Sequence, residues 1–263
     1  MNLCHFYPFI SRTFGVAIFG SLAQLAIAPP SLAIELDLSA FNSVGDVEAI
    51  GNAANLSNNS LFNDDAPDPD SNFNFSGNPA VSENTLTSAL PQFNSGDLDG
   101  SNPLGFDAVD EGSAIQNTVT VNAGDVLSFD WRFLTNEDPA LIDPTNPFSN
   151  DIGDYAFIAI DGNIDQRIEV KDNEGAFTAS GTNYDLEVSG RFSRTFMSDQ
   201  TIDLSIGVVD IRDPFNSSAF QVSNAAIQPI PFGISTNQSA VVLFGGVGLI
   251  LWRRHRRHSQ RNQ

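Results

Sequence analysis

Short runs of alternating or continuous apolar residues fill the middle of the chain, and clusters of Asn, Asp, Gly, Ser and Pro separate them. No apolar repeat of 3.6 residues, the mark of an amphipathic helix, is evident between Ile34 and Pro229. The length of these runs and their β-branched and aromatic content predict strands. The predicted strands are Ile115–Val121, Val126–Leu134, Tyr155–Ile160, Gln166–Val170, Tyr184–Val188, Phe192–Met197, Ile202–Val209 and Phe220–Ile227.

Turn-forming residues join several of these strands, at Asn122–Asp125, Asp161–Asn163 and Asn173–Gly175. Many short strands with turns roughly every 8–12 residues are typical of all-β folds. The sequence therefore predicts a jelly-roll-like sandwich of two antiparallel sheets. An orthogonal barrel is an alternative that the pattern leaves open.

Residues 34–112 are less regular and are rich in Asn, Ser and Asp. Their strand candidates are Asp46–Ile50 and Asn72–Ser76. So long a stretch of pure coil would be unusual in a compact domain, and apolar residues are spread along it. We expect this segment to supply the first strands and long loops of the same domain, with a separate disordered arm as the alternative.

The N-terminus, residues 1–33, has the order of a secretory signal peptide. Arg12 supplies a positive charge, Phe14–Ala28 is an uncharged apolar run, and Ser31-Leu32-Ala33 places small residues at the positions that signal peptidase reads. We expect the mature ectodomain to begin near Ile34 and to extend over residues 34–228.

The net charge of this ectodomain and its lack of histidine and cysteine exclude several classes of function. All 32 acidic residues of the chain lie in it, against 6 basic ones, which gives 6 − 32 = −26. Such a charge repels nucleic acid and attracts cations. The only cysteine, Cys4, lies in the predicted signal peptide, and the three histidines, His5, His255 and His258, lie outside the ectodomain. Disulfides, thiolate zinc sites and histidine-based catalysis are therefore excluded from it.

The C-terminus has the features of a membrane anchor. Ala240–Trp252 is uncharged and apolar, and an arginine cluster follows it directly. About 20 apolar residues span a bilayer, a length that is reached when Ile230–Ser239 is included. Arginines are typical of the cytoplasmic flank of a transmembrane helix. The residues that would stop the helix at the membrane are Arg253, Arg254, Arg256 and Arg257.

A proline-containing motif, a short apolar helix with glycines and a terminal arginine cluster together resemble the PEP-CTERM type of sorting signal. The motif residues are Pro229, Pro231, Phe232 and Gly233. Ile230 stands where the family has glutamate, and the following Ser235-Thr236 is similar to the variant found in cyanobacteria. The resemblance implies an exosortase-type processing enzyme as partner. It also implies passage through a membrane-anchored state to the cell surface or to an extracellular polysaccharide matrix.

The body of the chain resembles the choice-of-anchor domains of bacterial surface proteins. The likeness is carried by residues 128–137 (SFDWRFLTNE), by Asn150-Asp151 and by Tyr155–Ile158. It implies an extracellular location and a jelly-roll-like fold, without an established activity.

Acidic residues flank three of the predicted strands and suggest a calcium site between loops. Calcium takes six to eight oxygen ligands, largely carboxylates and carbonyls. Solvated acidic loops are the alternative, and the cluster Asp64–Asp70 is interpreted as a solvated turn. The candidate calcium ligands are Glu137, Asp138, Asp151, Asp154 and Asp210.

Two further kinds of chemistry are possible for these residue types. Trp131 and Tyr155 could stack on sugar rings, although their places within predicted strands favour a core role. Paired carboxylates could hydrolyse glycosides without histidine or cysteine, but no motif selects one pair. The sequence thus predicts a non-enzymatic exported protein with a structural or adhesive role. A lectin-like carbohydrate-binding module, with or without calcium, is the alternative.

Overall fold

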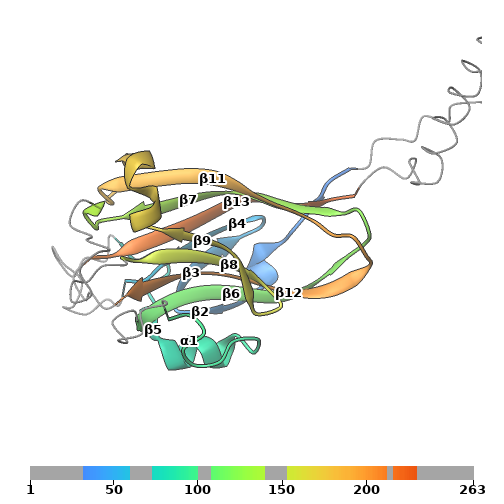
Figure 1. The fold of residues 1–263 in the computed structure, drawn as a ribbon, viewed down its shortest axis with the longest axis horizontal. Coiled ribbons are helices and arrows are strands. Elements are labelled where there is room, and N and C mark those ends of the chain that lie inside the picture. Colours follow the sequence, from blue (N-terminus) through green and yellow to red (C-terminus); the bar gives the residue numbers. More distant parts are fainter. Residues whose placement is uncertain (1–31, 60–72, 100–107, 140–152, 212–215, 230–263) are drawn as a thin grey trace, which may run out of the picture. The chain divides into compact units, whose positions relative to one another are not determined.

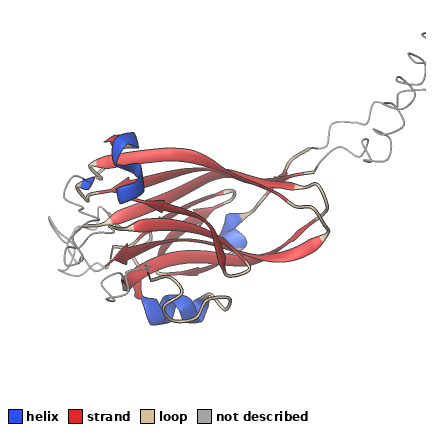
Figure 2. Cartoon of the chain, in the orientation of Figure 1, coloured by secondary structure: helices blue, strands red, loops and turns tan. Residues whose placement is uncertain are grey.

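The structure is a computed structural model that describes residues 32–59, 73–99, 108–139, 153–211 and 216–229. Two antiparallel sheets face each other in it (Figures 1 and 2), which confirms the predicted all-β sandwich. Both predicted terminal helices lie outside the described residues. Within the described ranges, no helix is both long and apolar enough to cross a membrane.

The first sheet, sheet A, has the strand order β10-β11-β7-β13-β4-β3, and β1 pairs with β13 on the side of β4. Its central strands β7 and β13 are long enough to run the length of the sandwich. The bounds are β1 Ile34–Glu35, β3 Asp46–Ile50, β4 Ala53–Ser57, β7 Val126–Thr135, β10 Thr178–Ala179, β11 Leu186–Thr195 and β13 Ser218–Gln228.

The second sheet, sheet B, has the order β2-β6-β12-β8-β9, and β5 pairs with β6. Consecutive strands cross repeatedly between the sheets, since β6, β8 and β12 belong to sheet B and β7, β11 and β13 to sheet A. The bounds are β2 Asn42–Val44, β5 Val81–Ser82, β6 Val109–Val121, β8 Tyr155–Ile160, β9 Asn163–Glu169 and β12 Gln200–Ile211.

The main core fills the space between the sheets, where alternate residues of each strand point inward. On β7 these are Leu127, Phe129, Trp131 and Phe133, and Phe220 of β13 packs with them. The residues between them on β7 point to the outer face of sheet A. This alternation explains why β7 carries Ser, Asp and Arg between its aromatic residues.

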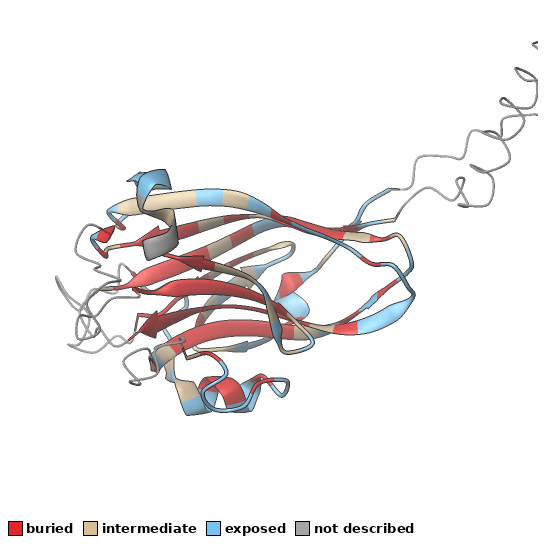
Figure 3. Cartoon of the chain, viewed as in Figure 1, coloured by how far each residue is buried: buried red, intermediate tan, exposed pale blue. Residues whose placement is uncertain are grey.

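A second core lies on the outer face of sheet B. The helix α1 (Glu83–Ala89) and the loop after it cover this face below β6 (Figures 1 and 3), with Leu86 and Leu90 fully or almost fully buried. They pack on Tyr155 and Phe157 of β8 and on Val209 of β12. Strand β8 is apolar along its whole length, in keeping with the burial of both its faces.

The structure corrects several of the sequence-based predictions. α1 was not expected, because its single apolar side is only two turns long. The predicted strands Tyr184–Val188 and Phe192–Met197 are one continuous strand, β11, since Gly190 between them stays in the ladder opposite Trp131. The described part of the predicted strand Asn72–Ser76, from Phe73 on, is not a strand: the backbone N–H groups of Phe75 and Ser76 donate to the buried carboxylate of Asp46 instead of to a neighbouring strand.

Two 3₁₀ helices, η1 (Leu38–Ala40) and η3 (Lys171–Ala176), complete the described elements, and η3 replaces the turn predicted at Asn173–Gly175. The predicted turn between β8 and β9 is confirmed. Asp161 and Gly162 both have positive φ, 53° and 74°, as a two-residue type I′ turn requires.

The two ends of the sandwich differ. At one, called the terminal end, Ile34 pairs with Ile227, so the chain enters and leaves the domain on neighbouring strands. At the other, called the loop end, Thr135 pairs with Ser218. A strand rises about 3.3 Å per residue, so the length of β13 separates these ends by roughly 30 Å.

Candidate functional site

Buried polar side chains join the two sheets at the loop end. Asp154, which precedes β8, is fully buried; its Oδ2 accepts from Asn58 Nδ2 at 2.7 Å and its Oδ1 from Ile211 N at 3.2 Å. Asn58, which follows β4, accepts through Oδ1 from Ser218 N at 2.6 Å. Because Asn58 and Ser218 belong to sheet A and Asp154 and Ile211 to sheet B, this network ties the sheets together.

Two more buried carboxylates belong to the same end. Glu137 Oε2 accepts from Asp154 N at 2.9 Å, and Glu137 N donates to Thr135 Oγ1 at 3.0 Å. Asp210 is buried on β12, directly before the Ile211 whose N–H donates to Asp154. Three of the five predicted calcium ligands, Glu137, Asp154 and Asp210, are thus buried at the loop end.

The structure describes only one of the other two predicted ligands. Asp138 is exposed, and Asp151 lies outside the described residues. In the described part of the chain, no three acidic, histidine or cysteine side chains are grouped so that they could hold an ion. The calcium site, which includes Asp151, therefore stays a prediction.

Trp131 lies in the main core, with 9% of its surface exposed and its ring 6.2 Å from that of Phe220. Gly190 on the neighbouring strand permits this position, because a Cβ there would lie 2.8 Å from Trp131 Cε2. Trp131 therefore presents no open ring face, and its predicted role in sugar stacking is wrong for this structure. The core interpretation holds.

Tyr155 is fully buried in the second core, so its ring is not accessible for stacking on a sugar. Its hydroxyl donates to the carbonyl of Leu98, and the Arg167 guanidinium lies 4.1 Å from its ring centroid. Burial raises the pKa of the Tyr155 hydroxyl, and the Arg167 charge opposes this only in part. Tyr155 thus stays a neutral hydrogen-bond donor that fastens the α1 segment to sheet B.

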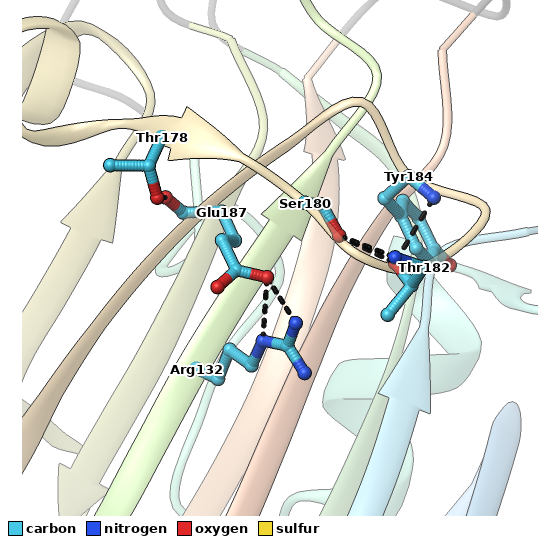
Figure 4. Close-up of polar contacts among 6 residues, drawn as sticks. All are labelled: Arg132, Thr178, Ser180, Thr182, Tyr184 and Glu187. Atoms are coloured by element: carbon cyan, nitrogen blue, oxygen red, sulfur yellow. Dashed lines mark hydrogen bonds and ion pairs between the residues drawn. The ribbon is translucent and has the colours of Figure 1, made fainter.

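The outer face of sheet A carries polar side chains away from the loop end, and β11 at its side is intermediate or exposed along most of its length (Figure 3). Figure 4 shows Glu187 of β11 reaching Arg132 of β7, where Arg132 Nε donates to Glu187 Oε2 at 3.0 Å and Nη2 donates to the same oxygen. Strand registers align one polar residue from each of five strands in a row across this face. The row is Ser189, Arg132, Gln221, Asn55 and Glu48.

Next to this row lies a cluster of three polar groups, Arg191, Asp130 and Asn224. Asp130 Oδ1 accepts from Arg191 Nη1 at 2.7 Å, and its Oδ2 accepts from Asn224 Nδ2 at 2.9 Å. Asn224 has a φ of 56° at a β-bulge in β13, between Ser223 and Ala226. The Asn224 hydrogen bond, with help from Arg191, lowers the pKa of Asp130, so this carboxylate is ionised at neutral pH.

Sequence reasoning missed Asn58 and the Arg191–Asp130–Asn224 cluster. A signal for the cluster was present in β13, where the inward residues Phe220 and Val222 are two apart but the next inward residue is Ala225. One extra residue in an alternating run marks a β-bulge, and a bulge re-aims a side chain. No comparable signal identified Asn58, since Asn residues are abundant throughout residues 34–112.

The predicted sorting and anchoring residues are almost all outside the described structure. Pro229, directly after β13, is described and half-buried. Pro231, Phe232 and Gly233 of the sorting motif and the four arginines of the membrane stop lie outside the described residues, so their roles stay predictions.

No protein-family model and no curated protein sequence matches this chain. Among solved structures, the chain is similar to a family 35 carbohydrate-binding module from an environmental isolate. That similarity has 10% sequence identity and a TM-score of 0.25, and it covers 46% of this chain and 73% of the module. A similarity of this size supports no statement about the function of this chain.

Proposed function

We propose that this chain is a non-enzymatic exported protein that serves a structural or adhesive role at the cell surface or in an extracellular polysaccharide matrix. Residues 1–33 act as the signal peptide, residues 34–228 form the ectodomain, and residues 229–263 anchor and sort it. The processing partner is an exosortase-type enzyme, and nucleic acid is not a partner. The strand connectivity is of jelly-roll type, in keeping with the strands that cross between the sheets.

The observation that carries this proposal is the pairing of β1 with β13. Ile34 lies opposite Ile227, so the predicted signal-peptide boundary and the start of the predicted sorting tail adjoin the same end of the domain. A domain held through this terminal end would present its loop end and its sheet faces to the surroundings. This is the arrangement that a tethered surface module needs.

Deletion of Ile230–Gln263 tests the proposal. The truncated protein should be released in soluble form into the medium, whereas the full chain should fractionate with the membrane or cell surface. Replacement of Arg253, Arg254, Arg256 and Arg257 by Gln is the matched control for the stop signal, and it should alter membrane retention while the domain folds normally. Persistent membrane association of the truncated protein would refute the proposed role of the tail.

A calcium-dependent, lectin-like role is the second candidate, and it is favoured by the carboxylates at the loop end. Glu137, Asp154 and Asp210 are buried there, and the residues flanking the ranges 60–72, 140–152 and 212–215 meet at the same end. Buried carboxylates at one end of the domain would attract a hard cation.

Thermal unfolding of the full chain with calcium and with a chelator tests this second candidate. Chelation should lower the melting temperature by several degrees, because an ion that binds only the folded state stabilises it. Asp151→Asn should abolish the calcium response, while Asp165→Asn, a substitution at the edge strand β9, should leave it intact. A melting temperature that is the same in calcium and chelator would remove calcium from the proposal.

A further inference from the structure

We propose that the outer face of sheet A, centred on Arg191, Asp130 and Asn224, is a contact surface for an uncharged polysaccharide. The inference rests on the proposed function, because it assigns the surface through which the ectodomain would hold an extracellular polysaccharide. It concerns a different part of the molecule from the loop end, and it involves neither calcium nor the tail.

The shape of this face suits a long, hydroxyl-rich chain. The row of five polar residues that crosses the sheet from Ser189 to Glu48 runs perpendicular to the strands. Neighbouring strands are about 4.8 Å apart, a spacing close to the length of one pyranose ring. A polysaccharide laid along the row would therefore meet about one polar side chain per sugar.

The three-residue cluster supplies directional hydrogen bonding beside this row. The side chains of Arg191 and Asp130 are 57% and 41% exposed, and Asn224 is exposed, so a ligand can reach all three. Together they offer guanidinium donors, carboxylate acceptors and an amide that does both, which matches neighbouring hydroxyl groups of a sugar.

The geometry of the cluster is held by the fold rather than by chance contact. Asn224 keeps a left-handed conformation, which is uncommon outside glycine, and it does so at a bulge that turns its amide toward Asp130. Arg191 is fixed from a second side, because its Nη2 donates to Ser128 Oγ at 3.0 Å. A surface that only needed to be solvated would not require this arrangement.

Charge identifies the kind of polysaccharide. By strand register the outer face of sheet A carries Arg132 and Arg191 against Glu35, Asp46, Glu48, Asp130 and Glu187, which is 2 − 5 = −3, while residues 34–228 carry −26. At the cluster and the row the charges are largely balanced, because Arg132 pairs with Glu187 and Arg191 pairs with Asp130. A polyanion would be repelled by the rest of the domain, and a polycation would be drawn to the other surfaces, so an uncharged partner fits best.

Affinity electrophoresis of the full chain, in mild detergent, tests the inference in gels that contain dextran, mannan or hydroxyethyl cellulose. Asn224→Gly removes the amide and keeps the positive φ that glycine tolerates. Arg191→Gln removes the exposed guanidinium. Each substitution should weaken the retardation by at least one neutral polysaccharide about three- to tenfold, as expected for one lost hydrogen-bonding group. Arg194→Gln is the matched control, because Arg194 lies on the same strand and pairs with Asp165 at the sheet edge, away from this face.

The outcomes separate this inference from the proposed function. If a neutral polysaccharide retards the parent chain and both variants equally, the assigned surface is wrong, although a polysaccharide partner is still supported. Retardation only by an anionic polysaccharide such as alginate, or dimerisation that Arg191→Gln abolishes, would also overturn it. No retardation by any polysaccharide would overturn it as well, while release of the tail-deleted protein would still support the exported, anchored role.

Discussion

The outer faces of the two sheets differ in polarity and in how far they are covered. On sheet B, α1 and the loop after it cover apolar side chains of β8 and β12, and Phe157 is fully buried with its ring 5.9 Å from that of Phe93. On sheet A, most of the outer face is left to Arg, Asp, Glu, Asn, Gln and Ser. The covered face stabilises the fold, and the open face is the one that offers hydrogen-bonding groups to a partner. A single sandwich thus divides stability and recognition between its two sides.

The largest expected effect lies on the covered face. Phe157→Ala should lower the free energy of unfolding by about 3–5 kcal/mol, because it leaves a cavity between sheet B and α1. Denaturant unfolding of the variant and the parent chain measures this. A loss of unfolding free energy below about 1 kcal/mol would contradict this comparison, since it would mean that the α1 segment does not pack tightly on this face.

A smaller effect is expected inside sheet A, at Gly190. Gly190→Ala should cost about 1–3 kcal/mol, because the new methyl group would collide with the Trp131 ring. Trp131→Phe in the same chain should recover part of this loss by shortening the ring, and the double variant is measured by the same unfolding experiment. Equal losses for Gly190→Ala with and without Trp131→Phe would place the strain elsewhere.

On the open face the expected effects on stability are slight. A double-mutant cycle of Arg132→Ala and Glu187→Ala should give a coupling of about 0.2–1 kcal/mol, as for other partly exposed ion pairs, and it should weaken with added salt. A coupling well above this range would mean that this face also contributes strongly to stability, and the division between the two faces would be less sharp.

The smallest effect is a shift in titration at Asp130. Its pKa is lowered in the folded protein, so its contribution to stability is present above the unfolded pKa and is lost as pH falls through the folded pKa. NMR titration should find its midpoint below that of an ordinary Asp, and Asn224→Gly should raise it. A midpoint that does not respond to Asn224→Gly would show that the amide is not the main cause.

The sequence predicted the class of fold because its signal is repeated many times. β8 was predicted at its observed bounds, Tyr155–Ile160, from an apolar run of strand length. The run Val126–Leu134 likewise predicted β7 to within one residue of its observed end. Features that depend on a single residue were harder to predict. α1 is two turns long, and Gly190 resembled a strand break until its partner Trp131 was known.

The candidate sites were less predictable, because each depends on contacts between distant segments. Glu137, Asp154 and Asp210 were selected for their places at strand ends, and the topology does bring those ends together. The hydrogen bonds of Asp154 with Asn58 and with the Ile211 N–H could not be read from the sequence, since they join segments more than 50 residues apart. Trp131 and Tyr155 illustrate the reverse case, in which residue type suggested an exposed site and strand position determined burial.

The position of β13 has a mechanical consequence. The tail follows the last residue of this strand, and β13 lies between β7 and β4 in the interior of sheet A. A pull on the tail would therefore act along β13, across hydrogen bonds to β7 that extend from the Gln228↔Val126 pair to the Ser218↔Thr135 pair. Bonds loaded in shear share the force and must break together, whereas an edge strand peels away one bond at a time. The domain is thus joined to the segment that follows Gln228 through an interior strand, which resists extraction better than an edge strand would.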